Sequence, residues 1–353
     1  MQPFFAGDFY NPSATYLAGR TARQKLNDFR SQVAQTLGAR PAEIVFTAGA
    51  TEANNLAISG VMRQYPDGEV LVSSIEHESV LAPAREYKCR EIPVTKDGIV
   101  DLGKLQKMIS PKTKLVSVML VNNELGTIQP IKEIAKILYK SSILLHVDAA
   151  QAPNVMDVHV SRLGADLLSL NGSKIYGPKQ SGILYVRAGV KLQPLILGGG
   201  QEYGLRSGTE NLAGVAGFTT ALSLAQKSRQ QQNQQLSTIR KQFIEGVAKD
   251  LPQVTINGSA KNQSPHILHL TFPGQDNERL MMQLDEAGIQ SAVGSACSAS
   301  KEESSHVLRA IGLSDEQARS SLRFSFGRQT SKEQIETVLK TLNAILRPTD
   351  SQQ

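Results

Sequence analysis

Short apolar blocks separated by longer mixed blocks run through the first two thirds of the chain. The blocks rich in β-branched residues predict strands at 43–47, 69–74, 114–121, 142–147, 166–170 and 182–186. Amphipathic segments of helical length lie between several of them, at 52–65, 78–88 and 130–140. Because strands that alternate with helices form parallel sheets, this pattern predicts an α/β domain with a mainly parallel central sheet and flanking helices.

The pattern changes after Thr209. Residues 210–248 are typical of one long helix, whose polar stretch QKSRQQQNQQ indicates an exposed surface between two domains. We expect a large α/β domain at residues 11–228 and a smaller α+β domain at residues 229–353, which residues 1–10 join. In the smaller domain, strands are predicted at 254–257, 266–272, 289–293 and 321–326, and helices at 277–286 and 332–346.

Composition and charge narrow the classes of protein to consider. The net charge of +6 over 353 residues is spread without a block of like charges, so direct nucleic-acid binding is not indicated. Two cysteines, Cys89 and Cys297, cannot form a disulfide framework and indicate a reducing compartment. No apolar run approaches the roughly 20 residues of a membrane span, and the start lacks the pattern of a signal peptide. We therefore expect a cytoplasmic protein with no membrane partner.

Polar residues follow the predicted strands of the large domain at their carboxyl ends, where open α/β sheets bind their ligands. Together they offer a helix start able to hold a phosphate, a ring, a carboxylate, hydrogen-bonding groups and an amine able to form a Schiff base. Each has an ordinary explanation by itself: a solvated turn lysine, a structural histidine, a helix cap. As a set they match what pyridoxal phosphate requires. The residues are Ala50, Thr51, His77, Asn122, Asp148, Gln151, Asn171, Ser173 and Lys174.

The smaller domain adds two candidate reactive residues. Cys297 lies in GSACSAS, among small residues that allow the backbone to move, and a thiol there suits nucleophilic attack. Arg323 lies in RFSFGR, where a guanidinium can hold a substrate carboxylate through two hydrogen bonds. The ordinary explanation for Arg323 is a surface arginine on an edge strand.

These motifs resemble the cysteine desulfurases, a family of fold type I pyridoxal phosphate enzymes in the class V aminotransferase group. The similar stretches are EIVFTAGATEANNLAI, EHESVL, VNNELGTIQPI, HVDAAQ, SKIYGPKQSGILYVR, GGGQEYGLRSGTEN, GSACSAS and SSLRFSFGR. They occur in the order typical of the family and extend over nearly the whole chain. The resemblance implies that the large domain binds the cofactor.

Matched position by position, the resemblance assigns Lys174 as the covalent anchor of pyridoxal phosphate. It implies that Asp148 pairs with the pyridine nitrogen, and that His77 stacks on the ring and assists proton transfer. Asn122 and Gln151 would hydrogen-bond the ring oxygen, and Asn122 would also face the substrate.

The resemblance also assigns the cofactor's phosphate. Ala50, Thr51 and Ser173 would hold it, with Asn171 beside them. Thr209 would reach the phosphate from the second subunit of a homodimer. The family usually has histidine at the position of Ser173 and serine at that of Asn171, so the phosphate contacts are expected to differ in detail.

The implied reaction transfers sulfur from L-cysteine. Arg323 would bind the substrate carboxylate and the Cys297 thiolate would take the sulfur, which gives L-alanine and a persulfide on Cys297. The persulfide would pass to acceptor proteins, such as an iron–sulfur scaffold or a tRNA thiolation factor.

Other functions remain open from the sequence alone. The same fold supports selenocysteine lyases and cysteine sulfinate desulfinases, which rely less on a flexible cysteine loop such as GSACSAS. The family also opens with an L-D-x-A-A-T-T-P segment and a helix, and this sequence is expected to start after them. A shortened protein acting only as a catalytically idle sulfur-transfer partner is therefore a further alternative, which the retained Lys174, Asp148, His77, Cys297 and Arg323 disfavour.

Overall fold

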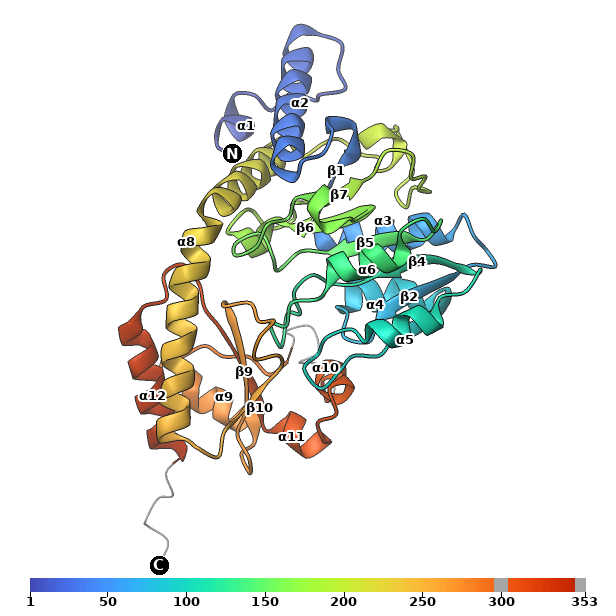
Figure 1. Ribbon diagram of the computed structural model, residues 1–353. Coiled ribbons are helices and arrows are strands. Elements are labelled where there is room, and N and C mark those ends of the chain that lie inside the picture. Colours follow the sequence, from blue (N-terminus) through green and yellow to red (C-terminus); the bar gives the residue numbers. More distant parts are fainter. Residues whose placement is uncertain (295–303, 347–353) are drawn as a thin grey trace, which may run out of the picture. The chain divides into compact units, whose positions relative to one another are not determined.

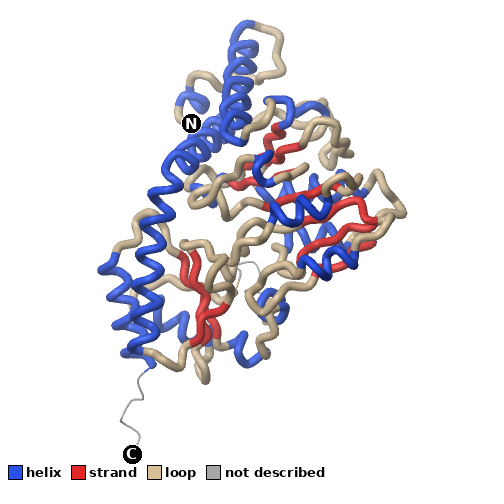
Figure 2. Tube along the Cα trace, viewed as in Figure 1, coloured by secondary structure: helices blue, strands red, loops and turns tan. Residues whose placement is uncertain are grey.

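The computed structural model describes residues 1–294 and 304–346. The chain forms two compact units (Figures 1 and 2). Unit 1 comprises Met1–Pro93, Val100–Val121 and Gln129–Arg229. Unit 2 comprises Val94–Ile99, Asn122–Ile128 and the chain from Gln230 onward.

Unit 1 is built on a seven-stranded sheet. Neighbouring strands among β2 to β6 pair parallel, whereas β7 is antiparallel to both β6 and β1. The mainly parallel sheet predicted from the sequence is confirmed. In sheet order the strands are β1 (Ile44–Thr47), β7 (Gly182–Val186), β6 (Leu167–Asn171), β5 (Leu144–Asp148), β4 (Thr113–Ser117), β2 (Glu69–Ser73) and β3 (Lys88–Ile92).

Helices cover both faces of this sheet, with α3 and α4 on one side and α5 and α6 on the other (Figure 1). The central strands are buried on both faces, which is why they read as continuous apolar runs rather than alternating ones. The helices that belong to unit 1 are α1 (Pro3–Ala6), α2 (Leu17–Leu37), α3 (Ala50–Met62), α4 (Glu78–Arg85), α5 (Leu102–Met108), α6 (Ile131–Leu138) and α7 (Val160–Leu163), with 3-10 turns η1 (Pro41–Glu43), η2 (Gly172–Ile175) and η3 (Glu202–Gly204).

Part of a predicted helix in unit 1 forms a strand instead. The helix expected at 78–88 ends at Arg85, and the chain continues as the edge strand β3. The charged Lys88, Arg90 and Glu91 interrupt this strand, so it contains no apolar run. Charged side chains are common on edge strands because they oppose pairing with another chain.

Residues 1–10 lie in unit 1, whereas the sequence predicted them in the smaller domain. The reason is packing against α2: the ring of Phe4 lies 5.7 Å from that of Phe29, edge to face, and Lys25 forms an ion pair with Asp8. An aromatic contact of this kind depends on how the chain folds back onto α2 and leaves no local pattern.

Unit 2 contains an antiparallel sheet of β8 (Thr255–Asn257), β9 (Ile267–Thr271) and β10 (Ser321–Ser325), with β9 in the centre. In its core the rings of Phe243 and Phe324 pack edge to face, with their centroids 5.1 Å apart. The strand expected at 289–293 is absent, because this segment makes a single bridge, between Ala292 and Arg323. The helices are α9 (Asn277–Glu286), α10 (His306–Ala310), α11 (Asp315–Arg319) and α12 (Lys332–Leu346), and α8 (Leu212–Asp250) contributes residues to both units.

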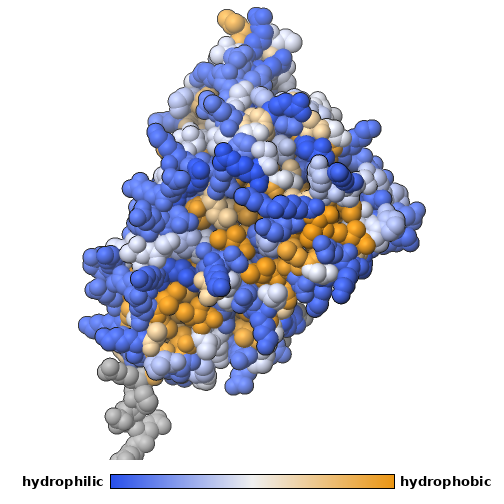
Figure 3. Space-filling model, viewed as in Figure 1, coloured by the Kyte–Doolittle hydropathy of each residue, from blue (hydrophilic) through white to orange (hydrophobic). Residues whose placement is uncertain are grey.

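The face seen in Figure 3 is largely hydrophilic, with apolar residues in separate patches. Among the described helices, none combines the length and the apolar character that crossing a membrane requires.

A buried ion pair ties the glycine-rich segment around η3 to the rest of unit 1. Arg30 of α2 donates to both carboxylate oxygens of Glu202 at 2.6 and 2.7 Å, and the two residues are 4% and 5% exposed. Glu202 also accepts from the Phe46 amide at 2.8 Å, and Arg30 donates to the Ile44 carbonyl at 2.7 Å. Burial opposes the charge of Arg30, but the hydrogen bonds and charge of Glu202 outweigh it and raise the pKa of Arg30.

Loss of one partner of this pair should strongly destabilise the protein, because the remaining charge would be buried without compensation. We expect Glu202→Ala to lower the free energy of unfolding by about 3–5 kcal/mol. Glu245→Ala is the matched control, since its pair with Lys241 is 66% and 75% exposed, and it should change stability by less than about 0.5 kcal/mol. Urea unfolding followed by circular dichroism measures both, and equal effects would contradict the prediction.

A second buried polar group links three neighbouring strands. The ring of His146 on β5 is fully buried, with Nδ1 2.8 Å from the Ser117 hydroxyl on β4 and Nε2 2.9 Å from the Ser169 hydroxyl on β6. A neutral imidazole has one donor and one acceptor nitrogen, and hydroxyls can complement both. Burial lowers the pKa of His146 to about 3.

This lowered pKa predicts loss of stability in acid. Below pH about 6.5 the unfolded chain takes up a proton at His146, whereas the folded protein stays neutral there until pH about 3. The stability that the buried neutral imidazole of His146 contributes is therefore fully present at neutral pH and is lost as pH falls towards 3. Between pH 6 and 4, His146→Gln should reduce the slope of unfolding free energy against pH by up to about 1.4 kcal/mol per unit. Parallel slopes in urea titrations of variant and parent would refute this.

Candidate active site

The strands of unit 1 bring the predicted polar residues to one edge of the sheet. Parallel strands β2, β4, β5 and β6 end at the same edge, and β1 ends there too because it and β6 are each antiparallel to β7. Asp148 is the last residue of β5, and Asn171 is the last residue of β6, its neighbour. Lys174 follows in η2, within three residues of that strand end.

Asp148 is a buried carboxylate held by hydrogen-bond donors. Its Oδ1 accepts from the Ala150 amide at 2.9 Å, and its Oδ2 accepts from Nδ2 of Asn54 at 2.8 Å. Asp148 is only 6% exposed. Such a fixed carboxylate suits a partner that presents a protonated ring nitrogen.

His77 is connected to Asp148 through two intervening side chains. Nδ1 of His77 accepts from the Ser79 amide at 3.0 Å and lies 2.8 Å from the Ser79 hydroxyl. Asn54 donates to that hydroxyl at 2.8 Å while it also donates to Asp148. Because Nδ1 serves as an acceptor, the neutral imidazole carries its proton on Nε2.

Asn54 and Ser79 were not identified from the sequence as site residues. Asn54 lies on the inward face of α3 with Ala53 and Ala57, and all three are fully buried. A single amide among alanines at helical spacing was the available signal, since a buried polar side chain requires partners.

The turn from β1 into α3 offers backbone donors. The first helical hydrogen bond runs from Ala53 to Gly49, so the amides of Ala50 and Thr51 precede it and point out of the helix start. Gly49 has φ of 137°, a conformation that other residues rarely adopt. At Gly182 of β7, a Cβ would lie 2.7 Å from the Cα of Gly49, so the close approach of this turn to the sheet requires glycine.

Lys174 and its neighbours form an exposed turn beyond β6. Lys174 is exposed, and its backbone carbonyl accepts from the side-chain amide of Asn154 at 2.7 Å. Asn171 accepts from the amide of Ser173 at 3.3 Å and from its hydroxyl at 3.2 Å. The amine is thus available while the backbone beneath it is fixed. Gln151 follows β5 and is partly buried.

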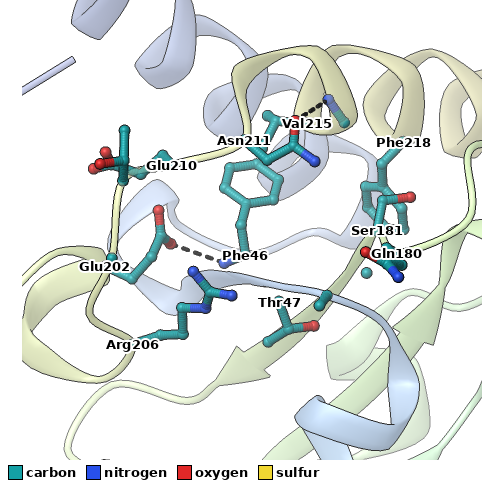
Figure 4. A pocket seen from close by; sticks show the side chains of 15 residues that line it. Phe46, Thr47, Gln180, Ser181, Glu202, Arg206, Glu210, Asn211, Val215 and Phe218 are labelled. Atoms are coloured by element: carbon teal, nitrogen blue, oxygen red, sulfur yellow. Dashed lines mark hydrogen bonds between the residues drawn. The ribbon is translucent and has the colours of Figure 1, made fainter. Parts of the chain in front are cut away.

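Thr209 lines a cavity of about 170 Å3 in unit 1 (Figure 4). Figure 4 shows the hydrogen bond that the Phe46 amide donates to Glu202. Arg206 of the same segment donates to Glu52 on α3 at 2.9 Å. The glycine-rich segment is therefore attached to β1 and α3, and the expected contact of Thr209 with a second subunit stays a prediction.

Asn122 and Arg323 belong to unit 2. Asn122 is fully buried, and its Oδ1 accepts from the amides of Glu124 and Leu125 at 2.9 and 2.8 Å. Arg323 donates through Nη1 to the Asn123 carbonyl at 2.9 Å. Asn122 is thus held in its turn, and Arg323 reaches the residue next to it.

Arg323 retains capacity for a further partner. Its Nε is buried without a hydrogen-bond partner among the described residues. Burial lowers the pKa of Arg323, and the charge of Glu124 partly offsets this effect. A partly buried guanidinium with an unused donor suits a carboxylate ligand, and Arg323 is partly buried although it lies on an edge strand. Cys297 lies outside the described residues.

The residues of unit 1 fit pyridoxal phosphate by their chemistry. A buried carboxylate receives N–H groups on both oxygens, and an exposed lysine follows the neighbouring strand. A helix start has outward amides behind Gly49, whose φ of 137° other residues rarely adopt. These are the partners of a pyridinium nitrogen, a carbonyl carbon and a phosphate, respectively.

Comparisons with known proteins identify the family of this chain. The profile of the aminotransferase class-V family matches residues 1–338. Cysteine desulfurase IscS of Dictyoglomus turgidum is 39% identical, in an alignment that covers 98% of this chain and 90% of the relative. Cysteine desulfurase IscS 1 of Archaeoglobus fulgidus is 41% identical and covers 98% and 92%.

Solved structures agree as well. A NifS-like protein superposes with a TM-score of 0.91 at 31% identity, over 98% of this chain and 93% of that one. The structure of SspA in complex with cysteine has a TM-score of 0.80 at 35% identity, over 92% and 93%. The chain therefore belongs to the class V aminotransferase family of fold type I enzymes, in its cysteine desulfurase branch.

Proposed function

We propose that this protein is a pyridoxal phosphate-dependent cysteine desulfurase that takes sulfur from L-cysteine and releases L-alanine. The observation that carries the proposal is the position of two residues on neighbouring strands. The buried Asp148, which accepts two N–H groups, ends β5, and Lys174 follows the end of β6. The kinship with cysteine desulfurases at 39–41% identity supports the choice of substrate.

Three residues of unit 1 act on the cofactor and on the protons that are transferred. The bound cofactor supplies an electron sink conjugated to the substrate's α-carbon. Asp148 holds a proton at the ring nitrogen, and Lys174 fixes the cofactor and then moves protons to and from the substrate. His77 would stack on the ring and assist proton transfer through Nε2, since its Nδ1 accepts from the Ser79 amide.

Further side chains hold the remaining parts of the cofactor and substrate. Asn122 and Gln151 bind the ring oxygen, and Asn122 also faces the substrate. Arg323 binds the substrate carboxylate through the donors that its contact with Asn123 leaves over. The phosphate is held by Ala50, Thr51 and Ser173, with Asn171 fixing Ser173, and by Thr209 of a second copy in a homodimer.

The sulfur passes to Cys297. The Cys297 thiolate attacks the substrate sulfur, so the carbon–sulfur bond breaks and a sulfur–sulfur bond forms. The electron pair of the broken bond stays on the β-carbon, which takes a proton and becomes the methyl group of alanine. No external oxidant is needed, because the sulfur is oxidised while the carbon is reduced. The persulfide then reaches a sulfur-acceptor protein in the cytoplasm, such as an iron–sulfur scaffold or a tRNA thiolation factor.

Lys174 is predicted to carry the cofactor. Borohydride reduction of the loaded protein followed by peptide mapping should place the pyridoxyl group on Lys174, and Lys174→Ala should lower alanine release at least about 1,000-fold, since it removes both the anchor and the proton carrier. Lys179→Ala is the control from the same exposed turn and should retain activity. Label found on Lys179 would overturn the assignment.

Cys297 is predicted to accept the sulfur. Cys297→Ser should bind pyridoxal phosphate and L-cysteine, visible as a change in absorbance, yet release alanine at under about 1% of the parent rate, because a hydroxyl is a far weaker nucleophile than a thiolate. Cys89→Ser should stay active, since burial and Glu91 raise the pKa of Cys89 to about 11 and keep it a thiol. Mass spectrometry after incubation with L-cysteine should detect one added sulfur on Cys297. Normal turnover by Cys297→Ser would refute this role.

A further inference from the structure

A carboxyl group that the proposed reaction does not use lies next to the site. Glu76 precedes His77 in the turn between β2 and α4 and is fully buried. Its Oε1 accepts from the Met119 amide at 2.8 Å, and the Ser73 side chain also bonds the carboxyl. Burying a carboxyl group is costly, so a fully buried Glu76 beside the site requires an explanation.

The contact with Met119 leads to Asp148 through the backbone. Beyond the end of β4, the Val118 amide donates to the His146 carbonyl at 3.0 Å, and the Leu120 amide donates to the Asp148 carbonyl at 2.8 Å. Met119 lies between these two donors, and in an extended segment its amide points to the opposite side, where Glu76 receives it. Glu76 therefore holds the segment that pairs with the last residues of β5.

We propose that Glu76 is a positioning residue for Asp148, acting through Met119 and Leu120 to fix the backbone from which the Asp148 carboxylate projects. Asn54 and Ala150 hold that carboxylate by its oxygens, and Glu76 holds the strand end beneath it. The proposal rests on the proposed function only in naming pyridoxal phosphate as the ligand that Asp148 binds.

The protonation of Glu76 decides which substitution can replace it. Burial raises the pKa of Glu76 well above its ordinary value, and the charge of Asp148 raises it further, against the opposing effect of the Met119 amide. This shift favours the neutral acid, which has one acceptor oxygen and one O–H donor. Glutamine has the same shape and also combines an acceptor with a donor, whereas alanine has neither and aspartate is too short to reach Met119.

Cofactor affinity of the apoprotein tests this directly. Pyridoxal phosphate is titrated into each apoprotein and binding is followed by absorbance, with no substrate present. Glu76→Gln should bind within about threefold of the parent, whereas Glu76→Ala and Glu76→Asp should bind roughly tenfold or more weakly, as expected for loss of a buried hydrogen bond. Glu78→Ala is the control, since this neighbouring side chain is 42% exposed and should leave affinity unchanged.

A double substitution separates positioning from a general loss of stability. If Glu76 acts through Asp148, Glu76→Ala should weaken cofactor binding less than about twofold further in an Asp148→Asn protein. An equal, additive effect in that background would overturn the proposal, as would parent-like affinity of Glu76→Ala or loss of affinity in Glu76→Gln. Should Glu76→Ala fail to fold, Glu76→Gln and Glu76→Asp decide the outcome. Failure to release alanine from cysteine would refute the proposed function but would leave these binding results readable.

Discussion

A buried carboxylate must be surrounded by hydrogen-bond donors, and this constraint organises the centre of unit 1. Asp148 is 6% exposed and receives N–H groups from Ala150 and Asn54. To supply them, α3 must place Asn54 over the end of β5, and the chain must turn sharply after that strand. The same asparagine reaches Ser79, which orients His77. One carboxylate thus fixes the relative positions of α3, α4 and β5.

The glycine-rich segment depends on a different interaction. Glu202 and Tyr203 both have positive φ, which is unfavourable for residues other than glycine. The bidentate bond of Glu202 to Arg30 and its bond from the Phe46 amide hold this strained turn in place. Because Arg206 is also bonded to α3, the segment that carries Thr209 is fixed within unit 1 before any second subunit is considered. Charged groups therefore hold this glycine-rich segment, together with the packing of Leu205 against the apolar core.

Buried polar groups recur through unit 1 as connections between strands. His146 bridges serines on the strands at either side, and Glu76 joins the turn after β2 to the segment after β4. Each replaces apolar packing with hydrogen bonds of fixed geometry, which restricts the register of neighbouring strands. These connections lie close to the residues that would bind the cofactor, where small displacements affect catalysis most.

The sequence alone determined the class of fold and indicated the candidate site residues. Apolar runs without alternation marked buried parallel strands, and polar residues at their ends marked Asp148 and Lys174, because both patterns are local. Tertiary structure alone decided which distant groups meet. Asn54, Ser79 and Glu76 acquire their roles from partners on other elements, Arg30 pairs with a residue 172 positions away, and residues 1–10 pack on α2. No local pattern contains these contacts, since burial and pairing are set only when the chain is folded.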